Sequence, residues 1–221
     1  MRWVLLFEAS GAVRDALTAL GHDAMSVDLR ASETPGAHHR GDVWDFIKSA
    51  DFRDADAVGA FPTCTYVAGS GIHWNYRIPG RAEKTDLAIQ DFQRLRVALK
   101  GKRSFVENPR GVVGKRTGWI PTQEIQPYQF GDDASKATTL RLDGLLPLVI
   151  PPESEWHPGR VVEWPRGSGK MVRRWSNQTD SGQNKLAPSE TRWAERSNTY
   201  PGIAAALALQ FAGDVRQKAA A

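Results

Sequence analysis

Short apolar runs alternate with helical repeats through the first part of the chain. Trp3 to Phe7 is an apolar run without helical period, which favours a buried strand. Apolar residues then recur at helical spacing from Ala12 to Leu20, and Gly21 is a typical left-handed helix stop. A second strand is predicted over Ala24 to Val27, ending at Asp28. The order is therefore strand, turn, helix, strand.

The same alternation continues further along the chain. A short helix is predicted near Trp44 to Ala50, and the next strand covers Ala57 to Phe61. An amphipathic helix over Ala88 to Leu99 precedes a strand that ends at Glu107. Alternating strands and helices of this length predict an α/β fold with a mostly parallel sheet and right-handed crossovers.

The pattern changes after about residue 150. From Pro151 to Asn198 there is little periodicity, although tryptophans and arginines are frequent. A regular apolar pattern returns over Pro201 to Phe211, a helix with Pro at its start. We therefore expect a single domain over residues 1–221, with 151–198 as a small irregular insert and 199–213 as a C-terminal helix.

Composition narrows the class of protein. The 221 residues are 41% hydrophobic and 24% charged, which is ordinary for a globular protein, and no apolar stretch approaches the roughly 20 residues of a membrane span. A single cysteine cannot form an internal disulfide, so a reducing, cytoplasmic setting is expected. The formal net charge of +4 is compatible with a phosphate-bearing partner without establishing one.

Two polar turns follow apolar runs and carry the candidate chemistry. Cys64 lies just after the strand that ends near Phe61, and Glu107 with Asn108 ends the next strand. A thiolate adds to the carbon beside the target carbon of a pyrimidine ring, while a carboxyl group holds the ring nitrogen. The alternative is that Cys64 is a buried structural thiol.

A cofactor site is predicted where parallel strands end. The turn Glu8-Ala9-Ser10-Gly11 ends the first strand, Asp28 ends the second, and Asp42 follows the third edge. A carboxylate at Asp28 suits a ribose diol, although a solvated strand-end residue is the alternative. A dinucleotide needs a glycine-rich turn, and this turn has Gly11 alone. S-adenosylmethionine, which has no phosphates, is the better match.

The order of these segments resembles the DNA cytosine-5 methyltransferases, and the resemblance covers nearly the whole chain. Phe7 to Gly11 is similar to that family's cofactor loop, and Asp28 and Asp42 fall where it holds ribose and adenine. Pro62-Thr63-Cys64 is similar to the nucleophile loop, although Thr63 separates residues that are adjacent in the family. Glu107-Asn108 is similar to the Glu-Asn motif.

The C-terminal part extends the resemblance. Asn198-Thr199-Tyr200-Pro201 is similar to the closing segment that returns to the cofactor. The chain departs from the family in lacking its Gln-x-Arg-x-Arg stretch, whose place Ser135 to Thr138 occupies. More narrowly, the chain resembles compact cytosine methyltransferases of bacteriophage and prophage genomes. The resemblance implies methyl transfer from S-adenosylmethionine to carbon 5 of cytosine in DNA, through a covalent adduct on Cys64.

Further residues are candidates for substrate contact. Pro62 and Asn108 belong to the two motifs, His73 and Trp74 could line the pocket or simply pack as a loop, and Lys136 and Thr138 could meet the base or a phosphate. In the insert, Arg173 and Arg174 beside Trp175 are candidates for phosphate contact and stacking, or a solvated face over an anchoring Trp. The histidines lack metal-ligand spacing, so no metal is expected.

Other functions remain open from the sequence. A free cytosine nucleotide is an alternative substrate, because the recognition region is small for a duplex. A catalytically inactive homologue that binds DNA or acts as a decoy would share every motif. A nicotinamide-dependent oxidoreductase would share the sheet, but the poor glycine pattern of the first turn argues against it.

Overall fold

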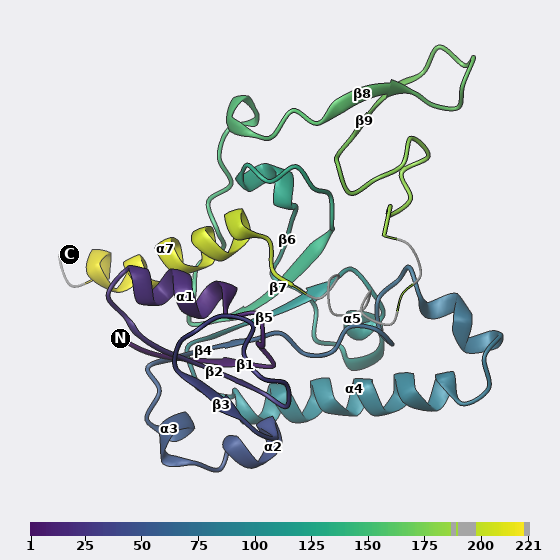
Figure 1. Ribbon diagram of the computed structural model, residues 1–221. Helices are drawn as coiled ribbons and strands as arrows, with labels where there is room; N and C mark the ends of the chain where they lie inside the picture. Colours follow the sequence, from purple (N-terminus) through teal and green to yellow (C-terminus); the bar gives the residue numbers. More distant parts are fainter. Residues whose placement is uncertain (187–188, 190–197, 219–221) are drawn as a thin grey trace.

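The computed structural model describes residues 1–186, 189 and 198–218 (Figure 1). Seven strands form the main sheet: β1 Arg2–Leu6, β2 Asp23–Asp28, β3 His38–Arg40, β4 Ala57–Ala60, β5 Ser104–Pro109, β6 Gln123–Ile125 and β7 Thr138–Asp143. The α-helices are α1 Ala12–Ala19, α2 Val43–Phe46, α3 Ala50–Arg53, α4 Arg81–Ala98, α5 Val113–Thr117 and α7 Pro201–Lys218. Short 3₁₀ helices are η1 Ile72–Tyr76, η2 Pro127–Phe130 and η3 Glu153–Glu155, and a separate two-stranded sheet joins β8 Arg160–Glu163 to β9 Met171–Arg174.

The main sheet has the order β3-β2-β1-β4-β5-β7-β6. Strands β1 to β5 pair in parallel, whereas β7 runs antiparallel to both β5 and β6. The prediction of a mixed α/β fold with a mostly parallel sheet is confirmed, and the arrangement is compatible with a Rossmann-like fold. The reversed pair β6–β7 was not predicted.

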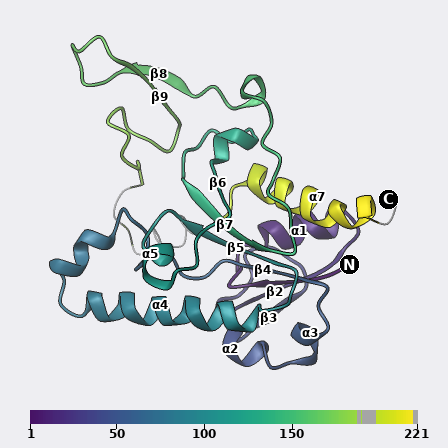
Figure 2. The ribbon, with the colours of Figure 1, turned by 180° about the vertical axis from the view of Figure 1, so that it is seen from behind.

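Two hydrophobic layers cover the sheet because successive side chains of a strand point to opposite faces. On one face, Trp3 and Leu5 of β1 pack with α1 and α7. On the other face, Val4 and Leu6 pack with α2, α3 and the long helix α4. Figures 1 and 2 show α1 and α7 on one side of the sheet and α4 on the other.

Helix boundaries differ from the predicted ones in two places. The helix predicted from Ala88 begins earlier, at Arg81. The prediction missed its first turns because they are polar and bury only Thr85 before the apolar stripe starts at Ile89. The short helix predicted near Trp44 is divided into α2 and α3. Ser49 causes the division, since its hydroxyl accepts the Phe52 N–H at 3.2 Å and starts a new helix.

Residues 151–186, which we call the arm, carry β8 and β9 and project away from the main sheet (Figures 1 and 2). No residue of the arm is buried. The arm contacts the rest of the protein at η2, where the Tyr128 ring stacks on Trp175 with centroids 4.1 Å apart. Three aromatic or basic residues of the predicted insert, Arg192, Trp193 and Arg196, lie outside the described residues.

Candidate active site at the carboxyl ends of the strands

A cavity of about 390 Å³ opens where the chain order of the strands reverses, between β1 and β4. Open α/β sheets bind their ligands at such a switch point, and small-molecule sites usually span about 300–1,000 Å³. Its lining comes from the ends of four strands: Phe7 after β1, Asp28 in β2, Cys64 after β4 and Glu107 in β5. A smaller cavity of about 30 Å³ adjoins the first turn.

The turn after β1 has an unusual backbone. Phe7 has a φ of 60°, the only positive φ of a non-glycine residue among the described residues. Gly11 has a φ of 74°, and a Cβ there would overlap the Thr34 hydroxyl and the Arg14 guanidinium. Left-handed backbone at a bulky residue costs conformational energy and is concentrated at functional sites. Both residues were predicted to bind cofactor, and Phe7 lines both cavities.

Glu8 is a buried carboxyl group in this turn. Its Oε1 accepts the Val13 N–H at 2.7 Å, whereas its Oε2 is buried without a hydrogen-bond partner. Burial raises the pKa of Glu8 to about 7, against the opposing effects of the Val13 N–H and the Arg14 charge. Glu8 and Ser10 line the small cavity, so the buried carboxyl group lies beside ligand-accessible space.

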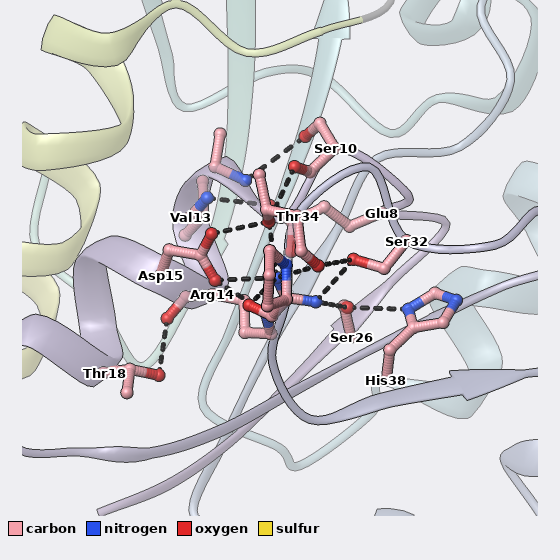
Figure 3. Close-up of polar contacts among 12 residues, drawn as sticks. Glu8, Ser10, Val13, Arg14, Asp15, Thr18, Ser26, Ser32, Thr34 and His38 are labelled. Carbon is pink, nitrogen blue, oxygen red and sulfur yellow. Dashed lines mark hydrogen bonds and ion pairs between the residues drawn. The ribbon is translucent and has the colours of Figure 1, made fainter.

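Arg14 connects the turn to the loop between β2 and β3, and the sequence analysis gave it no role. The side chain is buried, and Figure 3 shows it among hydroxyl groups. It donates to the hydroxyls of Ser26 (3.0 Å), Ser32 (2.8 Å) and Thr34 (2.6 Å), and to the carbonyls of Thr34 and Pro35 (3.2 Å each). An arginine at a position adjoining the apolar stripe of α1 is the sequence signal that could have revealed it.

His38 continues this polar cluster. Its Nδ1 lies 2.8 Å from the Ser26 hydroxyl (Figure 3). Its Nε2 lies 2.9 Å from the carbonyl oxygen of Arg30. Arg30 lines both cavities. The buried cluster therefore fixes the backbone of a residue that faces the site.

Asp28 and Asp42 both line the large cavity, as predicted for cofactor contacts. Asp28 Oδ1 accepts the Arg30 N–H at 2.8 Å, which orients its carboxylate. Asp42 also caps α2, since its Oδ1 accepts the Trp44 N–H at 2.7 Å. Each carboxylate keeps a second oxygen for other contacts.

Two further lining residues were missed by the sequence analysis. Trp44 meets the Phe7 ring edge-on with centroids 5.8 Å apart, and the Arg94 guanidinium lies over the Trp44 ring at 4.0 Å. Asp91 of α4 also faces the cavity, and burial raises its pKa. Both residues lie on helices rather than at the end of a strand, so the search for strand-end residues passed over them.

Asn198 lies beside the first turn, where the resemblance placed it. It lines the small cavity, and its Nδ2 donates to Glu33 Oε2 at 3.3 Å. The Glu33 N–H donates in turn to the Ala9 carbonyl at 2.8 Å. The segment before α7 therefore returns to the turn after β1.

Cys64 follows β4 in a tight turn. Its carbonyl accepts the N–H groups of Val67 (3.0 Å) and Ala68 (2.9 Å), and its side chain is half-buried at the cavity wall. The preceding Pro62 is buried and Thr63 is exposed, and both line the same cavity. The nucleophile candidate is therefore accessible to a ligand.

The loops after β4 and β5 are joined to each other. The Gly69 N–H donates to the Arg110 carbonyl at 2.9 Å, and the Val112 N–H donates to the Val67 carbonyl at 2.9 Å. A Cβ at Gly111 would overlap the Val67 carbonyl, so this close approach requires glycine. The backbone thus holds the Cys64 and Glu107 loops at a fixed separation.

Glu107 is buried at the cavity wall, in the C-terminal half of β5. Burial raises its pKa, while the Lys136 charge and a hydrogen bond from Thr138 act in the opposite direction. A carboxyl group that keeps its proton can donate a hydrogen bond to a ligand. Lys136 also lines the cavity, whereas Thr138 does not line it and instead hydrogen-bonds to Glu107.

Several predicted substrate residues lie away from both cavities. Asn108 is buried, and its Nδ2 donates to the Pro109 carbonyl at 2.8 Å. His73 and Trp74 are exposed on η1. In the arm, Arg173 pairs with Glu153 at 2.9 Å, and Arg174 donates to the Asp180 carbonyl at 2.9 Å.

Carboxyl groups outnumber cations among the described residues that line the large cavity. The carboxyl groups are Asp28, Asp42, Asp91 and Glu107, and the cations are Arg30 and Lys136. A phosphate-bearing ligand would meet more repulsion than attraction here, whereas a cationic or neutral one would not.

Neither a membrane span nor a metal cluster is found in the part of the chain that the structure describes. No helix there is long and apolar enough to cross a bilayer. No group of three or more His, Cys, Asp or Glu side chains is placed there to hold a metal ion. Comparison with known proteins adds no family: no protein-family model matches the chain, and no curated protein gives a significant match.

Proposed function

We propose that this protein transfers a methyl group from S-adenosylmethionine to carbon 5 of cytosine in DNA, through a covalent adduct on Cys64. The observation that carries the proposal is the shared cavity. Cys64 and Glu107, from the ends of adjacent strands, line the same space as Phe7, Asp28 and Asp42. The candidates for nucleophile, buried carboxyl group and cofactor contact therefore face one ligand volume.

The lining fits S-adenosylmethionine better than a dinucleotide. The surplus of carboxyl groups suits a cofactor that carries a sulfonium and an ammonium charge, and the turn has no glycine-rich cradle for a pyrophosphate. Asp28 would hold the ribose hydroxyls, and the rings of Phe7 and Trp44 offer apolar surface for the adenine. The bound cofactor supplies the methyl group from its sulfonium sulfur.

The chain's own residues account for activation of the base. The Cys64 sulfur adds to carbon 6, and the electron pair of the 5,6 double bond moves toward carbon 5. Burial raises the pKa of Glu107, and in its protonated form this carboxyl group would donate to the ring nitrogen and stabilise the developing charge. After carbon 5 has gained the methyl group, its proton passes to water, the electron pair of the C–H bond restores the 5,6 double bond, and the Cys64 thiolate leaves carbon 6.

A free cytosine nucleotide is the less favoured substrate. Such a substrate needs a closed phosphate pocket, and Arg30 and Lys136 are the only cations among the described residues of the large cavity. Arg30 is already oriented by Asp28, with 3.5 Å between its Nε and Oδ1. DNA keeps its phosphates outside the base pocket, so it avoids this conflict.

The test offers DNA and deoxycytidine nucleotide in parallel with isotopically methyl-labelled S-adenosylmethionine, followed by mass spectrometry of the nucleosides. We expect labelled 5-methylcytosine from DNA with the wild-type protein and none with Cys64→Ser. Label on adenine or on the exocyclic nitrogen of cytosine would show that the role of Cys64 is wrong.

A second readout isolates the covalent step. DNA with 5-fluorocytosine has no proton to lose from carbon 5, so the adduct on Cys64 should persist as a denaturation-resistant complex. Glu107→Gln keeps the side-chain shape and removes the carboxyl proton; a fall in rate of about 10²–10⁴-fold is expected. Unchanged rates would remove Glu107 from the mechanism.

A further inference from the structure

The segment directly after the nucleophile turn, residues 66–84, forms a lobe at the N-terminal end of α4 (Figures 1 and 2). Three large apolar side chains of this lobe face solvent: Trp74 is 42%, Tyr76 93% and Ile78 46% exposed. Exposed aromatic rings that cluster beside a site are a mark of an interaction surface.

The lobe is also basic. Its charged residues are Arg77, Arg81 and Lys84 against Glu83 alone. The Arg77 guanidinium lies 5.7 Å from the Trp74 ring, and Lys84 lies 5.8 Å from the Tyr66 ring. Positive charge interleaved with aromatic rings is the arrangement that single-stranded nucleic acid binds, through its phosphates and its bases.

Buried hydrogen bonds, rather than the exposed rings, hold the lobe in place. The Thr85 hydroxyl is buried and donates to the Tyr66 carbonyl at 2.9 Å, and Asn75 Nδ2 donates to that hydroxyl at 2.9 Å. Arg81 Nη2 donates to the Thr65 carbonyl at 3.0 Å. The rings of Trp74 and Tyr76 are thus presented on a support that ends at the residue following Cys64.

The arm does not offer an equivalent surface. The Trp175 ring is stacked on Tyr128, and Tyr128 also contacts Trp156 with centroids 5.6 Å apart. Arg173 is paired with Glu153, and Arg160 with Asp180. These aromatic rings and arginines of the arm already have partners within the protein.

We propose that the lobe, rather than the arm, binds an unpaired stretch of DNA next to the target cytosine. Trp74 and Tyr76 stack on exposed bases, while Arg77 and Lys84 contact phosphates. A duplex hides its base faces in its own stack, so exposed rings gain most from an unpaired strand. The choice of DNA rests on the proposed function; the binding itself requires no methyl transfer.

The test is fluorescence anisotropy of the full chain with a labelled mixed-sequence single-stranded oligodeoxynucleotide. Stacking is worth enough that Trp74→Ala with Tyr76→Ala should weaken binding by at least about tenfold. Arg77→Gln with Lys84→Gln should lower the slope of log K against log salt by about 1.4. The exposed control Val97→Ala on α4 and the arm variant Arg173→Gln should each change binding less than about twofold.

Several outcomes would overturn the inference. Unchanged binding by the double aromatic variant, or a larger loss with Arg173→Gln, would show that the surface is wrongly assigned. Equal binding of a blunt duplex would remove the commitment to an unpaired strand, and tighter binding of the matching oligoribonucleotide would remove the commitment to DNA. Lobe-dependent binding without any methyl transfer would leave the inference standing while contradicting the proposed function.

Discussion

The main sheet and the arm hold their shapes by different means. In the sheet, both faces are buried, and Trp3, Phe105 and Phe211 pack ring against ring in one of the two cores. In the arm, residues 151–186, no residue is buried; antiparallel backbone pairing joins β8 to β9, and ion pairs link each strand to a neighbouring segment. A two-stranded ribbon without a buried face is marginal by itself. The packed sheet therefore holds the cavity residues in fixed positions, whereas the conformation of the arm depends on contacts at its base.

The base of the arm shows where that dependence lies. Asn177 Nδ2 donates to the Ser135 carbonyl at 2.9 Å, and the Ser176 hydroxyl contacts the Asp133 carbonyl. In the same loop, Asp132 accepts the Gly202 N–H at the start of α7. Lys136, the residue after Ser135, lines the cavity. One loop thus connects the arm, the last helix and the site.

The sharpest test of the difference between the two regions compares an arginine from each. Arg14→Met should lower the free energy of unfolding by about 3–5 kcal/mol, because the hydroxyls and carbonyls that it contacts lose their buried donor. Arg173→Met in the arm should cost about 0–1 kcal/mol, since its ion pair is exposed. Urea denaturation measures both, and equal losses would contradict the distinction.

A pH series tests the polar interior of the sheet region. Because burial raises the pKa of Glu8 from 4.5 to about 7, the folded protein keeps a proton that the unfolded chain releases. Its contribution to stability is complete below about pH 4.5 and is lost as the pH rises through about 7. From pH 5 to pH 8, wild type should lose about 2–3 kcal/mol relative to Glu8→Gln, measured by urea denaturation. Parallel curves would show that Glu8 does not titrate in this range.

The join between the loops that carry Cys64 and Glu107 gives the next smaller effect. Gly111→Ala should cost about 1–3 kcal/mol and reduce methyl transfer, because its Cβ would push the Val67 carbonyl and the Cys64 turn away from Glu107. Gly114→Ala in α5 is the matched control, since a Cβ there would meet its nearest neighbour, the Ile120 side chain, at an ordinary contact distance of 3.5 Å. It should change stability by less than about 1 kcal/mol. Similar stability and activity in the two variants would exclude the close approach.

The smallest effects on stability are expected for exposed residues of the arm. Val161 is 59% and Met171 60% exposed on β8 and β9. Val161→Ala and Met171→Ala should each change the free energy of unfolding by less than about 0.5 kcal/mol, because little apolar surface is buried there. A larger loss in thermal or urea denaturation would mean that the arm contributes a core of its own.

Most of the parallel half of the fold and the centre of the site could be predicted from the sequence. Strands β1, β2, β4 and β5 follow apolar runs that end at turns, and carboxyl ends of parallel strands meet at one edge, which brings Cys64, Glu107 and Asp28 together. The parallel edge strand β3, His-His-Arg, has no apolar run and was not predicted. Strand β7 gave no such signal, because it contains two threonines and the buried Arg141. Arg141 is accommodated through its Nε, which donates to the Trp119 carbonyl at 2.7 Å.

The missed parts of the site share a physical cause. Arg14, Trp44 and Asp91 act through contacts between segments distant in the chain, and residue type alone does not fix such contacts. The arm posed the opposite problem. Its Trp175 looked available for stacking on a base, but the partner ring, Tyr128, lies in another segment of the protein.

The two outermost strands of the sheet have a consequence for self-association. Strand β3 is three residues long, His-His-Arg, and β6 is three residues long, Gln-Glu-Ile. An unpaired strand edge is a template on which another chain can add, and amyloid-like growth begins at long, flat, apolar ones. Borders this short and polar give an incoming strand few backbone groups and little apolar contact. The protein can therefore expose both margins of its sheet at high concentration with little tendency to polymerise through them.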